Sequence, residues 1–278
     1  MEKNRAATYA IIAAALWGMS FPITKIGLQN VSPVLFAFLR YAIASLLFIF
    51  LLFFTKNFYS IDTKKFVFLG IVAVTLPTIL QNVGLKYTTA YITGFLQSTG
   101  PIYTVILAYI FLSEKINIYK ILGILLAFVG VYLMVRPEGG GNLFGNLLVL
   151  SSAISYSIGG IIAKDLLNNG YKPLQIIAFS SIFGTIFLIP MIFFEKISFE
   201  YASIKYILFL AIFTTFIAYL LWYSAMEKME VSKLSFFTYL IPLFSLISSH
   251  FLLQEEIKIA TILAGFIAVL GVAIAQKA

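Results

Sequence analysis

Long apolar runs, each about the length of one bilayer crossing, follow one another along the whole chain. A bilayer core about 30 Å thick needs about 20 apolar residues per helix. Ten runs reach about that length: 8–28, 33–54, 66–85, 91–112, 118–135, 142–163, 173–194, 206–225, 234–253 and 259–276. The polar segments between them are short. The pattern therefore predicts an all-α polytopic membrane protein with ten transmembrane helices.

The composition excludes a soluble protein. Hydrophobic residues make up 61% of the 278 residues and charged residues only 11%, whereas soluble domains carry about 25% charged residues. The net charge of +8 has no soluble basic face to carry it, so nucleic acid is not an expected partner. Because the chain has no cysteine, disulfides, Fe–S clusters and thiol catalysis are excluded.

Lysine and arginine are divided unevenly between the two sides of the predicted bundle. Twelve lie on the side of the N-terminus: Lys3, Arg5, Lys56, Lys64, Lys65, Lys115, Lys120, Lys164, Lys172, Lys228, Lys233 and Lys277. Five lie on the opposite side: Lys86, Arg136, Lys196, Lys205 and Lys258. Since positive residues gather in cytoplasmic loops, we expect a multi-pass protein of the cell membrane with both termini in the cytoplasm.

The chain also repeats itself. A shift of 141 residues aligns proline, glutamate and glycine pairs: Pro101 with Pro242, Glu114 with Glu255, and Gly130 with Gly271. We predict a first five-helix repeat at 1–138, a glycine hinge at 139–141 and a second repeat at 142–278. Because five is odd, the second repeat must be inverted in the membrane. Inverted repeats are typical of secondary transporters, with the substrate site at the midplane between the halves.

Three features together resemble the EamA-type transporters of the drug/metabolite transporter superfamily. They are Trp17-Gly18 in the first span, Arg40 in the second, and a Pro…Leu-x-Glu…Gly-Val run that occurs twice, from Pro101 to Val131 and from Pro242 to Val272. The resemblance implies ten helices around a central cavity, and export or exchange of amino acids or other small metabolites. It leaves the substrate unidentified.

Polar and aromatic residues inside the spans are the candidate binding residues. One face of the fourth span and one face of the ninth carry small and polar side chains beside a proline that frees a backbone carbonyl. We expect these faces to line a cavity, and close helix packing is the alternative. An arginine within a span is costly and usually functional. The candidate substrate-binding residues are Trp17, Ser20, Arg40, Asn82, Gln97, Ser98, Tyr156, Thr238 and Tyr239.

A second group of residues is assigned to structure or gating: Lys25, Pro101, Glu114, Lys164, Pro242 and Glu255. An ion pair between Lys25 and Glu255 would mirror one between Lys164 and Glu114. For Arg40, a structural partner role is the alternative to substrate binding.

Two further expectations concern packing. Trp222 and Tyr223 lie near one end of the eighth span, where aromatic residues commonly form an interfacial belt. Small residues one heptad apart, Gly123–Gly130 in the fifth span and Ala264–Gly271 in the tenth, predict close packing of these two helices.

The sequence offers little for an enzyme. None of the acidic residues lies well inside a span, and the single histidine, His250, lies near a span end, so neither a hydrolytic dyad nor a metal or cofactor site is expected. We predict a secondary transporter, exporter or exchanger, that moves amino acids or similar small polar or anionic metabolites by alternating access, as a monomer and without obligatory protons. The alternative is a proton-coupled multidrug or hydrophobic-cation exporter. An intramembrane enzyme or a lipid-handling scaffold is more remote.

Overall fold

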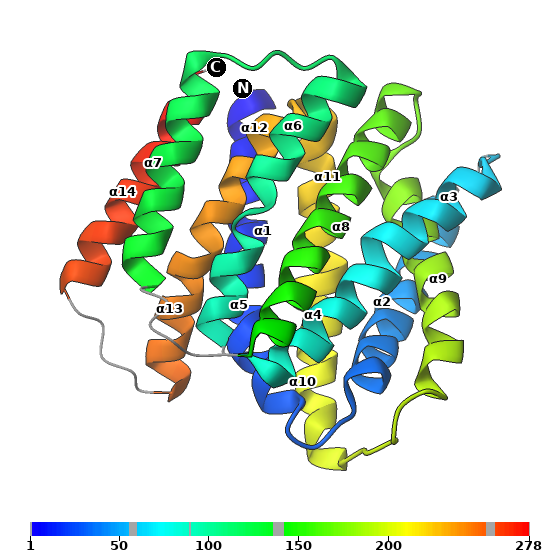
Figure 1. Cartoon of the computed structure of the whole chain (residues 1–278). Helices are drawn as coiled ribbons and strands as arrows, with labels where there is room; N and C mark the ends of the chain where they lie inside the picture. Colours follow the sequence, from blue (N-terminus) through cyan, green and yellow to red (C-terminus); the bar gives the residue numbers. More distant parts are fainter. Residues whose placement is uncertain (1, 56–59, 89, 136–141, 254–258, 278) are drawn as a thin grey trace.

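The computed structural model describes residues 2–55, 60–88, 90–135, 142–253 and 259–277 (Figure 1). Every element within these ranges is helical. In chain order they are α1 (Glu2–Gly27), α2 (Pro33–Thr55), α3 (Thr63–Gly70), η1 (Ile71–Thr75), α4 (Leu76–Tyr87), α5 (Ala90–Gln97), α6 (Gly100–Leu112), α7 (Ile118–Val135), α8 (Leu143–Asn168), α9 (Pro173–Ile192), η2 (Tyr201–Ser203), α10 (Ile204–Phe209), η3 (Leu210–Ile217), α11 (Ala218–Lys228), α12 (Val231–Ser235), η4 (Phe236–Leu240), α13 (Ile241–Leu253) and α14 (Ile259–Ala275).

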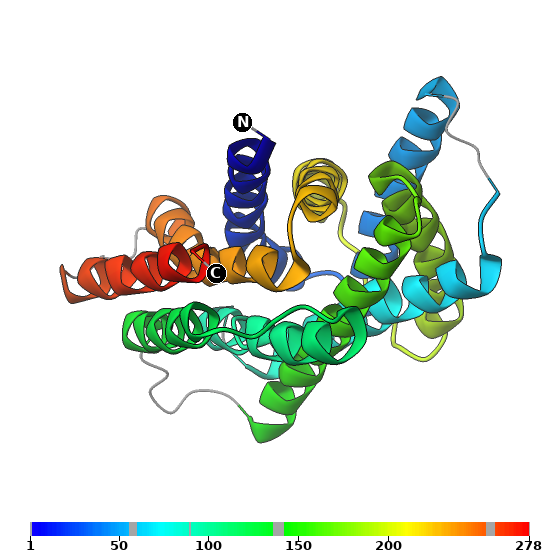
Figure 2. The same ribbon diagram turned by 90° about the horizontal axis from the view of Figure 1, so that it is seen from above.

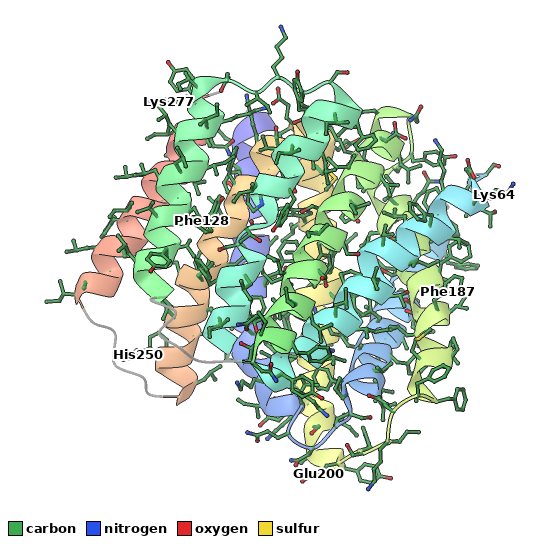
Figure 3. All side chains as sticks on the ribbon, in the orientation of Figure 1. Lys64, Phe128, Phe187, Glu200, His250 and Lys277 are labelled. Atoms are coloured by element: carbon green, nitrogen blue, oxygen red, sulfur yellow. The ribbon has the colours of Figure 1, made fainter. Side chains whose placement is uncertain are left out.

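The predicted fold class is confirmed. Within the described residues, eight continuous helical stretches are long and apolar enough to cross a membrane, and the segments Ile118–Leu133 and Ile262–Ala275 are shorter apolar helices. Both chain ends lie at the same end of the bundle (Figure 1), as an even number of spans requires. Charged Lys277 and Glu200 lie at opposite ends, while Phe187 projects from the flank (Figure 3). This distribution suits a helical bundle surrounded by lipid.

The predicted packing of the fifth and tenth spans is also confirmed. Helices α7 and α14 run side by side at one edge of the bundle in both views (Figure 1, Figure 2). A Cβ atom built on Gly130 would lie 2.3 Å from the Ala268 backbone nitrogen, and one built on Gly271 would lie 2.3 Å from the Ala127 backbone nitrogen. The two backbones therefore approach so closely that only glycine fits at the crossing.

Each half of the chain sends its first long helix into the other half. Helix α1 packs against α11 and α13, which lie late in the chain, and α8 packs against α4 and α6, which lie early. The central part of the bundle is therefore built from both halves, and this is where a site between the repeats is expected.

Four spans are interrupted, and the interruptions occupy matching places in the two halves. The fourth span breaks at residues 98–99, between α5 and α6, and Pro101 is the second residue of α6. The ninth span passes through the 3₁₀ segment η4, and Pro242 is the second residue of α13. The third and eighth spans contain the π-helical segments η1 and η3. Discontinuous helices near the midplane are a common way to build a transport site.

The ion pairs expected for the lysines within spans are not found as predicted. Lys164 donates to the backbone carbonyls of Met226 and Met229, at 2.8 and 2.9 Å, because the end of α11 presents unsatisfied carbonyls beside it. The cation beside Glu114 is instead Lys120, 3.9 Å away. Lys25 donates to the Thr88 carbonyl at 3.3 Å.

The structural assignment of Glu114 has a clear physical basis. Its carboxylate accepts hydrogen bonds from the backbone N–H groups of Val231 and Ser232, at 2.8 and 3.1 Å, and from the Ser232 hydroxyl. The end of the fourth span thereby caps the N-terminus of α12, whose first amides have no helical partner. Its repeat partner Glu255 and the predicted glycine hinge lie outside the described residues.

Candidate binding cavity

A cavity of about 180 Å³ lies among the spans at the centre of the bundle. Its wall is built from both halves of the chain. The lining residues are Trp17, Ser20 and Phe21 of α1, Arg40 of α2, Ala73 of η1, Gln81 of α4, Gln97 of α5, Gly100, Pro101 and Thr104 of α6, Ala153, Tyr156, Ser157 and Gly160 of α8, Tyr219, Trp222, Tyr223 and Met226 of α11, Val231 and Ser235 of α12, Thr238 of η4 and Ile241 of α13.

One wall of the cavity is aromatic. The Trp17 ring lies 5.2 Å from Tyr219 in an edge-to-face arrangement and 4.9 Å from Trp222. Tyr219 in turn lies 6.3 Å from Tyr223. The two tryptophans of the chain therefore both lie on the cavity wall, where flat apolar surfaces favour the hydrocarbon part of a ligand.

The expectation that Trp222 and Tyr223 form part of an interfacial belt is wrong. Their side chains are only 9% and 4% exposed, and both line the cavity. The reason is that α11 packs on α1 inside the bundle, so the end of this span faces protein rather than lipid. The signal was present in the sequence, because positions 219, 222, 223 and 226 share one helix face at i, i+3, i+4 and i+7.

Arg40 supplies the positive charge on the cavity wall. It is 8% exposed, and its Nε donates to the Thr215 hydroxyl at 2.6 Å while Nη2 donates to the Thr214 hydroxyl at 3.0 Å. None of the ion pairs among the described residues involves Arg40. A buried guanidinium held by neutral hydroxyls keeps its full charge, and an anionic ligand in the cavity would neutralise it.

Polar groups lie on other parts of the wall. The Gln97 amide nitrogen donates to the Gln81 side-chain oxygen and to the Ser152 hydroxyl, both at 3.0 Å. The hydroxyl of Tyr156 lies 3.5 Å from that of Thr78. The cavity thus combines one cation, several neutral hydrogen-bonding groups and an aromatic surface.

Six of the nine predicted binding residues line this cavity: Trp17, Ser20, Arg40, Gln97, Tyr156 and Thr238. The other three are directed elsewhere. Asn82 donates to the Pro33 carbonyl at 3.2 Å, and Ser98 donates to the Phe95 carbonyl at 2.6 Å in the turn between α5 and α6. Tyr239 is fully buried, because it follows the cavity residue Thr238 in a 3₁₀ turn, where successive side chains point in different directions.

The expected pairing of Trp17 with Tyr156 takes a different form. Both residues line the cavity, but the aromatic partners of Trp17 are Tyr219 and Trp222. Pro101 lines the cavity as well, whereas in the ninth span the neighbouring Ile241 does so in place of Pro242. For metals, the described residues contain no cluster of three or more His, Asp or Glu side chains that could hold an ion.

Comparison with known proteins places the chain in a family. The sequence profile of the EamA-like transporter family matches residues 4–136 and again residues 143–275, so the chain belongs to the EamA-like transporter family. The resemblance seen in the sequence is thereby confirmed. The chain is a multi-pass membrane transporter, which handles small solutes from within a lipid bilayer.

Individual relatives agree with this assignment. An uncharacterized transporter of Archaeoglobus fulgidus is 32% identical over 96% of this chain and 96% of its own length. A probable amino-acid metabolite efflux pump of Escherichia coli is 21% identical over 89% of this chain and 87% of its own. A protein of known crystal structure has the same fold, with a TM-score of 0.82 at 17% identity, covering 98% of this chain and 96% of its own.

Proposed function

We propose that the protein is a secondary transporter, exporter or exchanger, of amino acids or similar small polar or anionic metabolites, and that the central cavity is its substrate site. The observation that carries the proposal is the guanidinium of Arg40, which lies on the cavity wall with no carboxylate partner among the described residues. A buried charge is stable only when it is paired or hydrogen-bonded. A substrate carboxylate supplies the missing partner.

The rest of the cavity suits the same class of ligand. The amides of Gln81 and Gln97 can hydrogen-bond polar groups, and the ring surfaces of Trp17 and Trp222 can contact an apolar side chain. The Escherichia coli relative named as a probable amino-acid metabolite efflux pump agrees with this chemistry. From the uneven lysine and arginine count we further propose that both termini are cytoplasmic in the cell membrane.

A hydrophobic-cation exporter is the rival function, and the cavity argues against it. A cationic drug needs a carboxylate or a surface free of positive charge. The lining residues include Arg40 and no aspartate or glutamate. Electrostatic repulsion at a buried site would oppose a cationic ligand strongly.

A matched set of solutes tests the proposal. Purified protein in liposomes is loaded with leucine, and exchange is measured against external leucine, leucinamide and isoamylamine. The first carries both a carboxylate and an amine, the second has lost the negative charge, and the third has lost the carboxylate carbon. We expect leucine to exchange, and the two cations to compete weakly or not at all. Preferred exchange of isoamylamine would contradict the proposal.

Energy coupling follows from the titratable groups on the wall. Arg40, Tyr156, Tyr219 and Tyr223 are the ionisable lining residues, and none of these side chains titrates near neutral pH at its ordinary pKa. We therefore expect solute to follow its own gradient or to exchange for another solute. In liposomes with the membrane potential clamped, an imposed pH gradient should leave the final solute distribution unchanged.

Uphill accumulation driven by the pH gradient would show that a proton is transported. The variants Lys25→Met and His250→Gln then identify the group, because the residue that carries the proton is the one whose replacement abolishes the accumulation.

A further inference from the structure

The π-helical segment η3 presents one backbone carbonyl to a side chain from the other half of the chain. At the end of η3 the backbone N–H of Ala218 donates to the carbonyls of Phe213 and Thr215, and thereby bypasses Thr214, its partner in a regular α-helix. The Thr214 carbonyl accepts the indole N–H of Trp17 at 2.9 Å. The wide turn therefore joins the eighth span to the cavity residue Trp17.

The first half contains the same arrangement in the segment η1. The Leu76 N–H donates to the Ile71 carbonyl and bypasses Val72, whose carbonyl accepts the Ser155 hydroxyl of α8 at 2.7 Å. Val72 and Thr214 are separated by 142 residues, close to the repeat shift. π-Helical turns are rare and are frequent at functional sites, so a matched pair at the contact between the halves indicates a role in the site.

The two segments differ in one respect, and that difference lies at Arg40. Counting 142 residues back, the positions of Thr214 and Thr215 correspond to Val72 and Ala73, which have no hydroxyl. Only η3 therefore provides two neighbouring hydroxyl groups, both fully buried. The Thr214 hydroxyl also donates to the Leu210 carbonyl at 2.8 Å, which turns its lone pairs toward the guanidinium.

The two threonines occupy one particular edge of the guanidinium. Nε and Nη2, which donate to Thr215 and Thr214, form one side of the planar fork. The fork has five N–H groups, and the three that remain, two on Nη1 and one on Nη2, have no hydrogen-bond acceptor among the described residues. The remaining Nη1–Nη2 edge carries two parallel N–H groups, the geometry that binds a carboxylate through both oxygens.

We propose that Thr214 and Thr215 are positioning residues for substrate recognition, which fix the Arg40 guanidinium so that its Nη1–Nη2 edge faces the cavity and binds a carboxylate or another planar oxyanion through two hydrogen bonds. The inference rests on the proposed function, because it assigns the recognition geometry of that same site. Neutral hydroxyls suit this task, since an aspartate or glutamate in their place would neutralise Arg40 and compete with the ligand.

Fluorescence tests the inference without knowledge of the natural substrate. Both tryptophans of the chain line the cavity, so iodide quenching in a neutral detergent reports anion entry, and acetate, which does not quench, should protect against it. Acrylamide is the neutral control. For the native protein we expect iodide quenching that acetate suppresses, and in Arg40→Gln we expect both effects to be lost while acrylamide quenching is unchanged.

The variant Thr215→Val separates positioning from charge. Arg40 keeps its charge, so iodide should still quench, but the acetate concentration that gives half-protection should rise about tenfold, the loss expected for one hydrogen bond to a charged group. Thr215→Ser keeps the hydroxyl and should restore native protection. In the Arg40→Gln background, Thr215→Val should add no effect, because both changes act on one interaction.

Each failure has its own pattern. If Arg40→Gln leaves iodide quenching and acetate protection intact, the cavity does not bind anions at Arg40 and the proposed function fails. If Arg40→Gln loses protection but Thr215→Val retains it, the proposed function stands and the positioning role is overturned. If Thr215→Ser is as defective as Thr215→Val, the methyl packing matters rather than the hydroxyl, and the positioning role is again overturned.

Discussion

Replacing Arg40 by glutamine should lower transport of a carboxylate solute about 10- to 150-fold, the range that corresponds to one charged hydrogen-bonded contact. Glutamine keeps an amide donor for the hydroxyls of Thr214 and Thr215, which bind Arg40 in the native protein, so the fold should survive. The loss should appear as a higher KM for the carboxylate solute and should be absent for a neutral solute of similar size. The measurement is initial exchange in liposomes across a concentration series.

Arg40→Lys is the matched control for charge without the planar fork. A lysine ammonium is a point charge that cannot bind a carboxylate through two parallel N–H groups. Its activity should therefore lie between those of the native protein and Arg40→Gln. Unchanged exchange kinetics in both variants, together with a large fall in the thermal unfolding temperature, would assign Arg40 to structure instead.

Gly271→Ala should cause a large loss of stability for so small a change. A Cβ atom at Gly271 would lie 2.3 Å from the Ala127 backbone nitrogen and 2.7 Å from its Cα, so α7 and α14 must move apart to admit one methyl group. Overpacking of this kind costs about 1–3 kcal/mol. The measurement is thermal unfolding of the protein purified in detergent.

Gly94→Ala is the matched control for this prediction. It adds the same methyl group to a helix, but a Cβ atom at Gly94 meets nothing within 4 Å, and alanine favours helix over glycine by about 0.5–1 kcal/mol. Gly94→Ala should therefore leave the unfolding temperature unchanged or raise it. Equal stability of the two variants would contradict the close crossing of α7 and α14.

The sequence predicts the fold well because the bilayer imposes a length and a polarity on every span. Ten apolar runs of suitable length became helical spans in the structure. The close crossing at Gly130 and Gly271 was also predictable, since small residues one heptad apart have few purposes other than packing.

The site was predicted less completely, because distance along a span does not tell which neighbour a side chain meets. Trp222 lies near a span end, where an aromatic residue usually contacts the interface, yet α1 covers it. Asn82 is adjacent to the cavity residue Gln81 but points to the Pro33 carbonyl.

The role of Thr214 had no signal in the hydropathy pattern. One extra residue in a helical turn leaves the apolar character of the span unchanged, so η3 could not be inferred from composition or periodicity. A search for hydroxyl residues at matching places in the two halves would have singled out this threonine, since its counterpart Val72 is apolar.

The exchange of first helices between the halves has a consequence for biosynthesis. Helix α1 is made first, but its partners α11 and α13 are among the last helices to be made. Until they arrive, the indole N–H of Trp17 lacks the Thr214 carbonyl that accepts it in the finished protein. The nascent first half must therefore remain an open assembly of separate helices in the bilayer, and the cavity closes only when synthesis of the second half is nearly complete.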